Sequence, residues 1–177
     1  AIGTGDLSES AMGWCTYNGD HISMYSVNCS VPKTLIRYVI GWVGDNSTAQ
    51  VRAILQDIID TPVSPELLPA AQDGTIQQKT EDIIGPYEIH DFFLYHFLKY
   101  GAAPEKLRFL AEHAFAGTYT AVQIETWLKT FLRRFFTQQF KRSCMPDGPK
   151  VGTISLSPRG DWRMPSDASS AVWFSNL

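Results

Sequence analysis

The chain has 177 residues, of which 44% are hydrophobic and 19% charged, and its formal net charge is −3. This length fits one domain or a large piece of one, and the composition suits a packed core rather than global disorder. No apolar run approaches the ~18 residues that span a bilayer and no signal peptide opens the sequence, so no membrane partner is expected.

The first expected elements surround a glycine-rich turn at the start of the chain. Gly3-Thr4-Gly5 reads as the end of a strand, and Thr4 or Asp6 caps a short helix over 6–17 with Glu9 in its first turn. The polar segment 18–31, which contains an Asn-Gly-Asp turn signal, is expected to be a loop.

Two helices and a long loop are expected next. Pro32 suits the first position of a helix over 32–43 that ends at Gly44. A Ser-x-x-Gln capping pattern at Ser47 opens a second helix that runs to Ile59. The following residues, 61–84, are rich in Pro, Gly, Asp and Gln without a clear period and predict a long loop.

The second half of the chain predicts three further helices. They cover 86–100, 104–115 and a longer segment from the Thr120 capping pattern to Phe140. Apolar side chains recur along the first and last of them at helical spacing and are expected to form the core. They are Ile89, Phe92, Phe93, Phe97, Tyr100, Ile124, Leu128, Phe131, Leu132, Phe135 and Phe136.

The last part of the chain carries proline at four positions across 143–168 and is expected to be a loop, with a short helix after Ser166. The sequence therefore predicts a mostly α chain with long loops at 18–31, 61–84 and 143–168. It contains no internal repeat and few segments that alternate as strands do.

Charge is distributed unevenly along this framework. Residues 1–32 contain no Lys or Arg but carry Asp6, Glu9 and Asp20, whereas residues 133–163 are rich in basic side chains. Such a pattern suits a site that holds phosphates, with a metal at one point. It also suits two solvated surface patches, and charge alone favours the patches. The basic residues are Arg133, Arg134, Lys141, Arg142, Lys150, Arg159 and Arg163.

The residues 3–9 form a candidate ligand site. The glycines permit close approach of a ligand, the amides at the helix start attract anions, and Glu9 adds a carboxylate for Mg²⁺ or a ribose hydroxyl. Glu9, Gly13, Thr16 and Tyr17 would share one face of a helix over 6–17, which Gly13 leaves open. The alternative is a capped surface helix in which Gly13 permits close packing.

Other site classes are weaker. Cys15, Cys29 and Cys144 form no C-x-x-C pair, so we expect reduced thiols and a cytoplasmic location rather than disulfides. His90 and His96 do not share a helix face well, which argues against zinc. A pI of about 5.8 argues against nucleic acid as a partner.

Several short segments follow one another in an order that points to one enzyme family. They are Gly3-Thr4-Gly5-Asp6-Leu7-Ser8-Glu9, Gly13-Trp14-Cys15-Thr16-Tyr17-Asn18-Gly19-Asp20, Val31-Pro32-Lys33-Thr34-Leu35-Ile36, Ser64-Pro65-Glu66-Leu67, Thr80-Glu81-Asp82-Ile83-Ile84-Gly85-Pro86-Tyr87-Glu88, Phe140-Lys141-Arg142-Ser143 and Leu156-Ser157-Pro158-Arg159-Gly160-Asp161-Trp162-Arg163. In this order, and over nearly the whole chain, they resemble bacterial glutamine-dependent NAD synthetases of the ATP-pyrophosphatase group.

The resemblance implies a fold and an activity. Residues 1–177 would be a single carboxy-terminal segment of the synthetase domain, the helical half of an α/β (adenine nucleotide alpha hydrolase-like) domain whose parallel sheet lies largely upstream. The family is a carbon–nitrogen ligase that amidates deamido-NAD to NAD. ATP adenylates the nicotinate carboxylate, and ammonia derived from glutamine then attacks the adenylate.

The resemblance also implies residue roles. Thr4 and Lys33 would contact ATP, which enters with Mg²⁺ as its substrate complex, and Glu9 would contact deamido-NAD or the metal. The remaining deamido-NAD contacts would come from Trp14, Cys15, Thr16, Tyr17, Asp20 and Lys141. Adenylyl transfer needs positioning and neutralised charge more than a protein nucleophile, so Cys15 is expected to be a wall residue.

The sequence departs from the family pattern in what it lacks. The S-G-G-x-D-S loop that binds the pyrophosphate of ATP is absent, as is the glutaminase domain with its cysteine nucleophile. We therefore expect a fragment that does not make NAD alone. Its expected partners are the missing amino-terminal part of the synthetase, the glutaminase domain and further copies in a homo-oligomer.

Two alternatives stay open. One is a non-catalytic helical scaffold or binding module, in which residues 3–17 are structural. The other is a related ATP-pyrophosphatase amidotransferase such as a GMP synthetase, although residues 14–17 and 140–142 favour an NAD synthetase.

Overall fold

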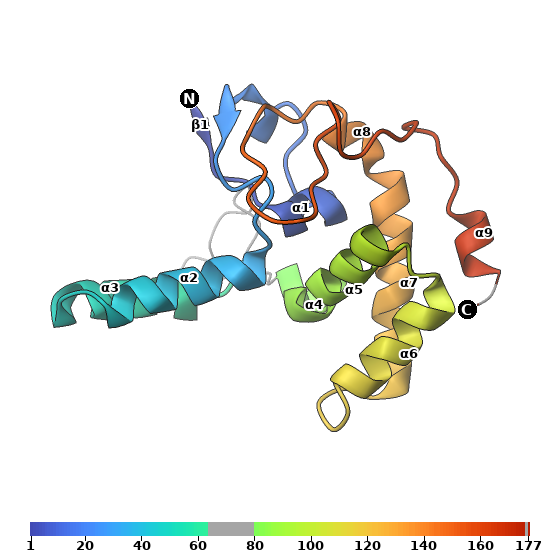
Figure 1. The fold of residues 1–177 in the computed structure, drawn as a ribbon, viewed down its shortest axis with the longest axis horizontal. Coiled ribbons are helices and arrows are strands. Elements are labelled where there is room, and N and C mark those ends of the chain that lie inside the picture. Colours follow the sequence, from blue (N-terminus) through green and yellow to red (C-terminus); the bar gives the residue numbers. More distant parts are fainter. Residues whose placement is uncertain (64–79, 176) are drawn as a thin grey trace, which may run out of the picture.

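A computed structural model describes residues 1–63, 80–175 and 177 and confirms a mostly helical chain. Its sheet consists of β1 (Ile2–Gly3) and β2 (Tyr25–Ser26), which pair in parallel with Ile2 opposite Tyr25 (Figure 1). The expected strand end at the start of the chain is thus present. Within the described residues no helix is long and apolar enough to cross a membrane.

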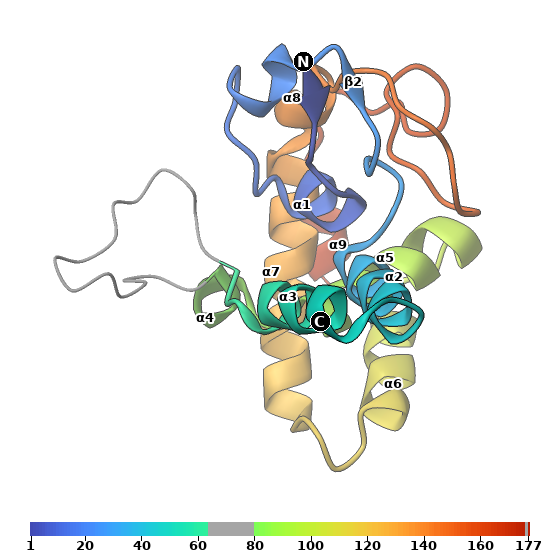
Figure 2. The same cartoon turned by 90° about the vertical axis from the view of Figure 1, so that its left-hand side faces the viewer.

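The core of the body is formed by α5 (Tyr87–Tyr100), α6 (Pro104–Ala114) and α7 (Ala121–Thr137). The predicted apolar stripes of α5 and α7 lie in it, apart from Phe92, which is only partly buried, and Tyr100, which is 60% exposed. Tyr100 is the last residue of α5, where the helix leaves the core. Figure 2 shows α7 running past α1 toward the small sheet, which places its last turns beside the amino-terminal segment.

The helix ends follow their predicted signals closely in this body. Thr120 forms a capping box with Gln123, and Gly101 ends α5 in a left-handed conformation with φ 59°. The predicted single helix to Phe140 is wrong in one detail. It breaks at Gln138, and a short α8 (Gln139–Arg142) follows.

The expected helix over 6–17 is much shorter in the structure. Asp6 caps α1 (Leu7–Met12) through a capping box with Glu9, and the helix ends at Gly13 with φ 63°. Glycine adopts this left-handed conformation at low cost and so ends the helix there. The shared helix face expected for Glu9, Gly13, Thr16 and Tyr17 therefore does not exist. The predicted loop 18–31 is mainly irregular, with β2 and the 3-10 turn η1 (Asp20–Ile22) inside it.

An arm of two antiparallel helices, α2 (Lys33–Asp45) and α3 (Ala49–Asp60), projects from the body (Figure 1). Pro32 is the N-cap rather than the first helical residue, and Gly44 lies buried inside α2, next to Arg52 and Leu55 of α3. Thr48, not Ser47, caps α3, because the Ser47 hydroxyl instead donates to the Val43 carbonyl.

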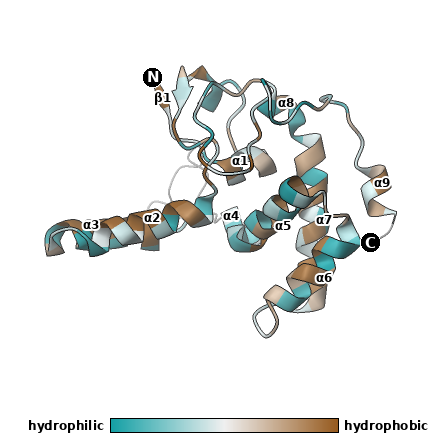
Figure 3. Cartoon of the chain, viewed as in Figure 1, coloured by the Kyte–Doolittle hydropathy of each residue, from teal (hydrophilic) through white to brown (hydrophobic). Residues whose placement is uncertain are grey.

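The arm exposes apolar side chains to an unusual degree. Tyr38 is 78% exposed, Trp42 67% and Ile54 56%, and hydrophobic residues are spread along both helices in Figure 3. A helix hairpin in water normally buries such a stripe, so this surface differs from that of the body.

The loop predicted over 61–84 is partly wrong, since its last residues form α4 (Thr80–Ile84). Residues 64–79 lie outside the described part of the chain. The predicted loop 143–168 is irregular, and the short helix expected after Ser166 is α9 (Ala171–Phe174). Asp147 within this segment bridges to Tyr25 and so ties the segment to the small sheet.

Candidate functional site

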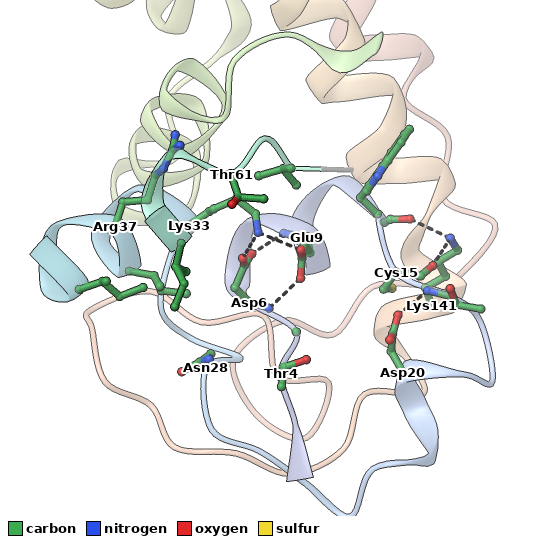
Figure 4. Close-up of a pocket in the computed structure, with 18 of the residues that line it drawn as sticks. Thr4, Asp6, Glu9, Cys15, Asp20, Asn28, Lys33, Arg37, Thr61 and Lys141 are labelled. Atoms are coloured by element: carbon green, nitrogen blue, oxygen red, sulfur yellow. Dashed lines mark hydrogen bonds and ion pairs between the residues drawn. The ribbon is translucent and has the colours of Figure 1, made fainter. Parts of the chain in front are cut away.

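A pocket with a cavity volume of about 560 Å³ lies where α1, the base of α2 and the α7–α8 junction meet (Figure 4). It brings together every predicted site residue except Tyr17, which is 47% exposed and packs against Phe140 and His21 outside it. The predicted residues that line the pocket are Thr4, Glu9, Trp14, Cys15, Thr16, Asp20, Lys33 and Lys141.

One side of the pocket, here called the acidic wall, consists of Asp6, Glu9 and Lys33. The Lys33 ammonium lies 2.7 Å from Asp6 Oδ2 and 2.9 Å from Glu9 Oε1. The other carboxylate oxygens close the capping box. Asp6 Oδ1 accepts from the Glu9 amide at 2.8 Å and Glu9 Oε2 from the Asp6 amide at 3.1 Å. Every carboxylate oxygen of this wall is thus already engaged.

Burial shapes the protonation of the acidic wall. Burial raises the pKa of Asp6 above its ordinary value, and burial together with the Asp6 charge raises the pKa of Glu9. Burial by itself would lower the pKa of Lys33, but the charges and hydrogen bonds of the two carboxylates together raise it. Lys33 is therefore held as a cation between its partners.

Asp91, a buried residue of α5, fixes the position of Lys33. Its carboxylate accepts from the Ser8 hydroxyl and from the amide and hydroxyl of Thr34, the latter at 3.1 and 2.7 Å. The Ser8 hydroxyl in turn accepts from the Lys33 amide at 2.8 Å. Burial raises the pKa of Asp91 above its ordinary value, and its hydrogen bonds from Ser8 and Thr34 oppose that rise.

The opposite side, here called the basic wall, consists of Arg134, Lys141 and Arg142, which meet backbone carbonyls. Lys141 Nζ donates to the carbonyls of Gly13 and Cys15, both at 2.7 Å. Arg134 Nε donates to the Met12 carbonyl at 2.7 Å, and the Arg134 guanidinium lies 4.6 Å from the Trp14 ring centroid. Among the salt bridges of the described residues, none involves these three cations.

Arg142 is the buried base of this wall, at 1% exposed. Its NH1 donates to the carbonyls of Ser10 and Ala11, its NH2 to that of Phe135, and its Nε to the Gln139 side chain. Burial lowers the pKa of this guanidinium below its ordinary value. Each of its three guanidinium nitrogens donates at least one hydrogen bond, so the residue holds the end of α1 against α7 and α8.

Gly13 joins the two walls, and it is closely packed. A Cβ built on Gly13 would approach the Gln138 side chain to 2.2 Å. The open helix face predicted there is therefore wrong, because Gly13 permits close packing against Gln138. Beyond it, burial raises the pKa of the Cys15 thiol, which keeps the group protonated and makes it a poor nucleophile.

The lower rim of the pocket is polar. Thr4 follows β1 in an exposed position, and Asp20 accepts a hydrogen bond from the Thr16 amide, which closes the turn after Trp14 (Figure 4). Exposed hydroxyl and carboxylate groups at a pocket mouth suit a ligand with sugar hydroxyls.

A Mg²⁺ ion at Glu9 would have to displace Lys33 and break the capping box. The described residues include no group of three or more His, Cys, Asp or Glu side chains placed to hold a metal ion. The arrangement therefore does not fit a resident metal at Glu9.

The sequence indicated Asp6 as a cap and as part of an acidic segment, and Arg134 and Arg142 only as members of a basic segment; Asp91 carried no signal. A seven-residue spacing between Arg134 and Lys141 was a usable signal, since it places both on one side of a helix. The hydrogen-bond partners of Asp91 lie 57 and 83 positions away along the chain, and those of Arg134 and Lys141 more than 120. No local pattern in the sequence indicates such contacts.

Comparisons with known proteins give one answer. The chain is 42% identical to the glutamine-dependent NAD(+) synthetases of Mycobacterium bovis and Mycobacterium leprae, over 99% of this chain and 29% of each relative. It is 28% identical to the glutamine-dependent NAD(+) synthetase of Thermotoga maritima over 92% of this chain and 24% of that protein. It matches a carboxy-terminal part of the relatives and spans about 29% of their length.

The fold agrees with these similarities. The crystal structure of a glutamine-dependent NAD(+) synthetase from Cytophaga hutchinsonii superposes with a TM-score of 0.69 at 20% identity, over 97% of this chain and 25% of that one. At this identity the likeness concerns the fold. No protein-family model matches the chain.

Proposed function

We propose that this chain is one segment of the synthetase domain of a glutamine-dependent NAD(+) synthetase and supplies the deamido-NAD side of its site. The single observation that carries the proposal is the pocket, in which side chains from α1, α2 and α8 converge. These are the residues that the resemblance assigns to substrates, and similarity to such synthetases extends over 99% of the chain.

In the proposed reaction, a carboxylate oxygen of nicotinate attacks the α-phosphorus of ATP and pyrophosphate leaves. Ammonia derived from glutamine then attacks the acyl carbon, and AMP leaves with the electron pair. Adenylyl transfer and amide formation depend on orientation and on charge compensation. The residues of this chain would bind and orient deamido-NAD, with Trp14, Cys15, Thr16 and Asp20 forming the wall around it.

The two walls would contact different parts of the substrates. Thr4 and Lys33 would lie toward ATP, which enters as its Mg²⁺ complex, and Glu9 toward a ribose hydroxyl of deamido-NAD. Because Lys33 already neutralises part of the acidic wall, most positive charge for phosphate would come from Lys141. Phosphate prefers cations that no carboxylate compensates.

The proposed partners follow from the same assignment. The chain spans about 29% of its relatives, so the rest of the synthetase domain and the glutaminase domain would complete the enzyme. The exposed apolar side chains of α2 and α3 support a covered surface in the assembly and a homo-oligomer. The three free thiols support the reducing cytoplasm as its compartment.

Isothermal titration of the 177-residue chain with deamido-NAD tests this proposal. We expect saturable binding that Lys141→Ala weakens by roughly tenfold, since an ammonium–phosphate contact is lost. The control Lys99→Ala removes an equal charge from an exposed position on α5 and should leave binding unchanged. Equal binding by wild type and Lys141→Ala contradicts the assignment of this pocket.

Titration with XMP in place of deamido-NAD separates the related amidotransferase alternative. The proposal requires deamido-NAD to bind more tightly than XMP. A chain that binds XMP more tightly has a GMP synthetase-like site. A chain that binds neither nucleotide fits the helical scaffold.

A further inference from the structure

Arg134 is a partly buried cation of the pocket lining, and most of its hydrogen-bonding capacity is unused. Its Nε is used by the Met12 carbonyl, and among the described residues its two terminal amino groups donate to nothing. The other cations differ. Lys33 is held by two carboxylates and Lys141 by two carbonyls, whereas Arg37 is exposed on the arm and donates to the Ile59 carbonyl.

The surroundings of Arg134 orient this free edge. The Trp14 ring covers one face of the guanidinium at 4.6 Å, and the bond from Nε to Met12 anchors the side chain to the end of α1. Both Arg134 and Trp14 line the pocket. A guanidinium with one covered face and an anchored Nε presents its two terminal amino groups as a planar, preorganised pair of donors.

Such a donor pair beside an aromatic ring fits an aromatic carboxylate. A carboxylate has two coplanar oxygens that match the two donors, and a flat ring bearing it can lie along the neighbouring indole. The partly buried position strengthens the pairing, because less water surrounds the charge there, and the same burial lowers the pKa of this guanidinium.

We infer that Arg134 binds the nicotinate carboxylate of deamido-NAD and is thereby a residue that distinguishes this substrate from the amidated product. The inference rests on the proposed function and extends it to a residue that the sequence pattern did not assign. When the carboxylate becomes an amide, its charge disappears and one of its two acceptors becomes a donor that faces the guanidinium. Arg134 would therefore favour release of NAD. It would also hold the carboxylate next to the phosphates of ATP, where two anions otherwise repel.

The test compares binding of deamido-NAD and NAD, measured by isothermal titration, in wild type and three variants. Arg134→Gln removes the charge, Arg134→Lys keeps the charge without the planar donor pair, and Arg133→Gln is the matched control on the exposed side of α7. Arg134→Gln should weaken deamido-NAD binding by roughly tenfold or more and NAD binding by less than about threefold. The affinity of Arg134→Lys for deamido-NAD should lie between those of wild type and Arg134→Gln. Arg133→Gln should bind both dinucleotides as wild type does.

Each other outcome is decisive. Equal loss of both dinucleotides in Arg134→Gln means that the residue contacts phosphate, which overturns the inference while the proposed function stands. Unchanged deamido-NAD binding in that variant also overturns it. If the wild-type chain binds neither dinucleotide, the proposed function fails and the inference fails with it. Circular dichroism of each variant shows whether lost binding reflects lost folding, and Trp14→Phe, which keeps Arg134 and an aromatic ring, must then retain the preference for deamido-NAD.

Discussion

The two walls of the pocket hold their cations in opposite ways. In the acidic wall, Lys33 is compensated by Asp6 and Glu9, whose remaining oxygens cap α1. In the basic wall, Arg134, Lys141 and Arg142 meet carbonyl dipoles of residues 10–15 and, among the described residues, no carboxylate. Carbonyls satisfy hydrogen bonds but leave the positive charge uncancelled.

This difference shows which wall can be stable without a bound ligand. The acidic wall needs no ligand for its hydrogen bonds, because Lys33 and two backbone amides occupy every carboxylate oxygen of Asp6 and Glu9. The basic wall keeps net positive charge beside a cavity and gains from an anion. The two walls therefore predict different responses to the loss of a cation. Loss of Lys33 or of the buried Arg142 should mainly lower the stability of the fold. Loss of Arg134 or Lys141, which line the pocket, should mainly weaken ligand binding.

Replacement of Arg142 by Met should have the largest effect on stability. It removes a fully buried side chain and leaves carbonyls of Ser10 and Ala11 without their side-chain donor, at a cost of about 3–5 kcal/mol. Urea unfolding followed by circular dichroism measures the loss. Arg133→Met on the exposed side of α7 is the control and should stay near wild type.

Lys33→Met and Lys141→Met test the comparison itself. Lys33→Met leaves two largely buried carboxylates uncompensated and should lower the free energy of unfolding by about 2–3 kcal/mol. Lys141→Met loses two hydrogen bonds at the pocket edge and should cost about 1 kcal/mol. The same urea experiment reports both values. Equal losses, or a larger one for Lys141→Met, would break the distinction between the walls.

Gly13→Ala and Gly101→Ala form a matched pair for the junction of the walls. Both glycines have a left-handed φ, 63° and 59°, but only at Gly13 does an added Cβ meet a neighbour, the Gln138 side chain at 2.2 Å. Gly13→Ala should therefore destabilise by about 1–2 kcal/mol more than Gly101→Ala, measured by thermal unfolding. Similar costs for the two would mean that Gln138 moves aside freely and that the junction is not tightly packed.

The smallest expected effect is a pH dependence in Lys33→Met. Burial raises the pKa of Asp6 and Glu9, so between their unfolded and folded pKa values the folded state binds more protons than the unfolded state. Stability from these groups is then present at low pH and lost as pH rises through the folded values. Without Lys33, the free energy of unfolding should depend more steeply on pH. The loss of this free energy caused by Lys33→Met should therefore be smaller at pH 4.5 than at pH 7, by ~1 kcal/mol. A penalty that grows on acidification would contradict buried, uncompensated carboxylates.

Much of the body was predictable because its signals are local. The capping box at Thr120, the glycine stop at Gly101 and the apolar stripe of α7 act within one or two helical turns, and all three are confirmed. The two wrong helix boundaries arise where two local signals compete. A left-handed Gly13 ends α1 within what looked like a longer helix, and Thr48 rather than Ser47 caps α3 because the Ser47 hydroxyl bonds back to α2.

By itself the sequence determined the helical class and the core of the body. Through its resemblance to a family it also indicated most of the side chains that were predicted to bind ligand and that line the pocket. Only the tertiary structure decided which charges cancel. Lys33 meets Asp6 and Glu9 because α2 starts beside α1, and Arg134 meets Met12 and Trp14 because the last turns of α7 pass the end of α1. The physical reason is range. Helix propensity and capping act over three or four residues, whereas the free charge of a pocket depends on contacts between segments that the fold brings together from more than a hundred positions apart.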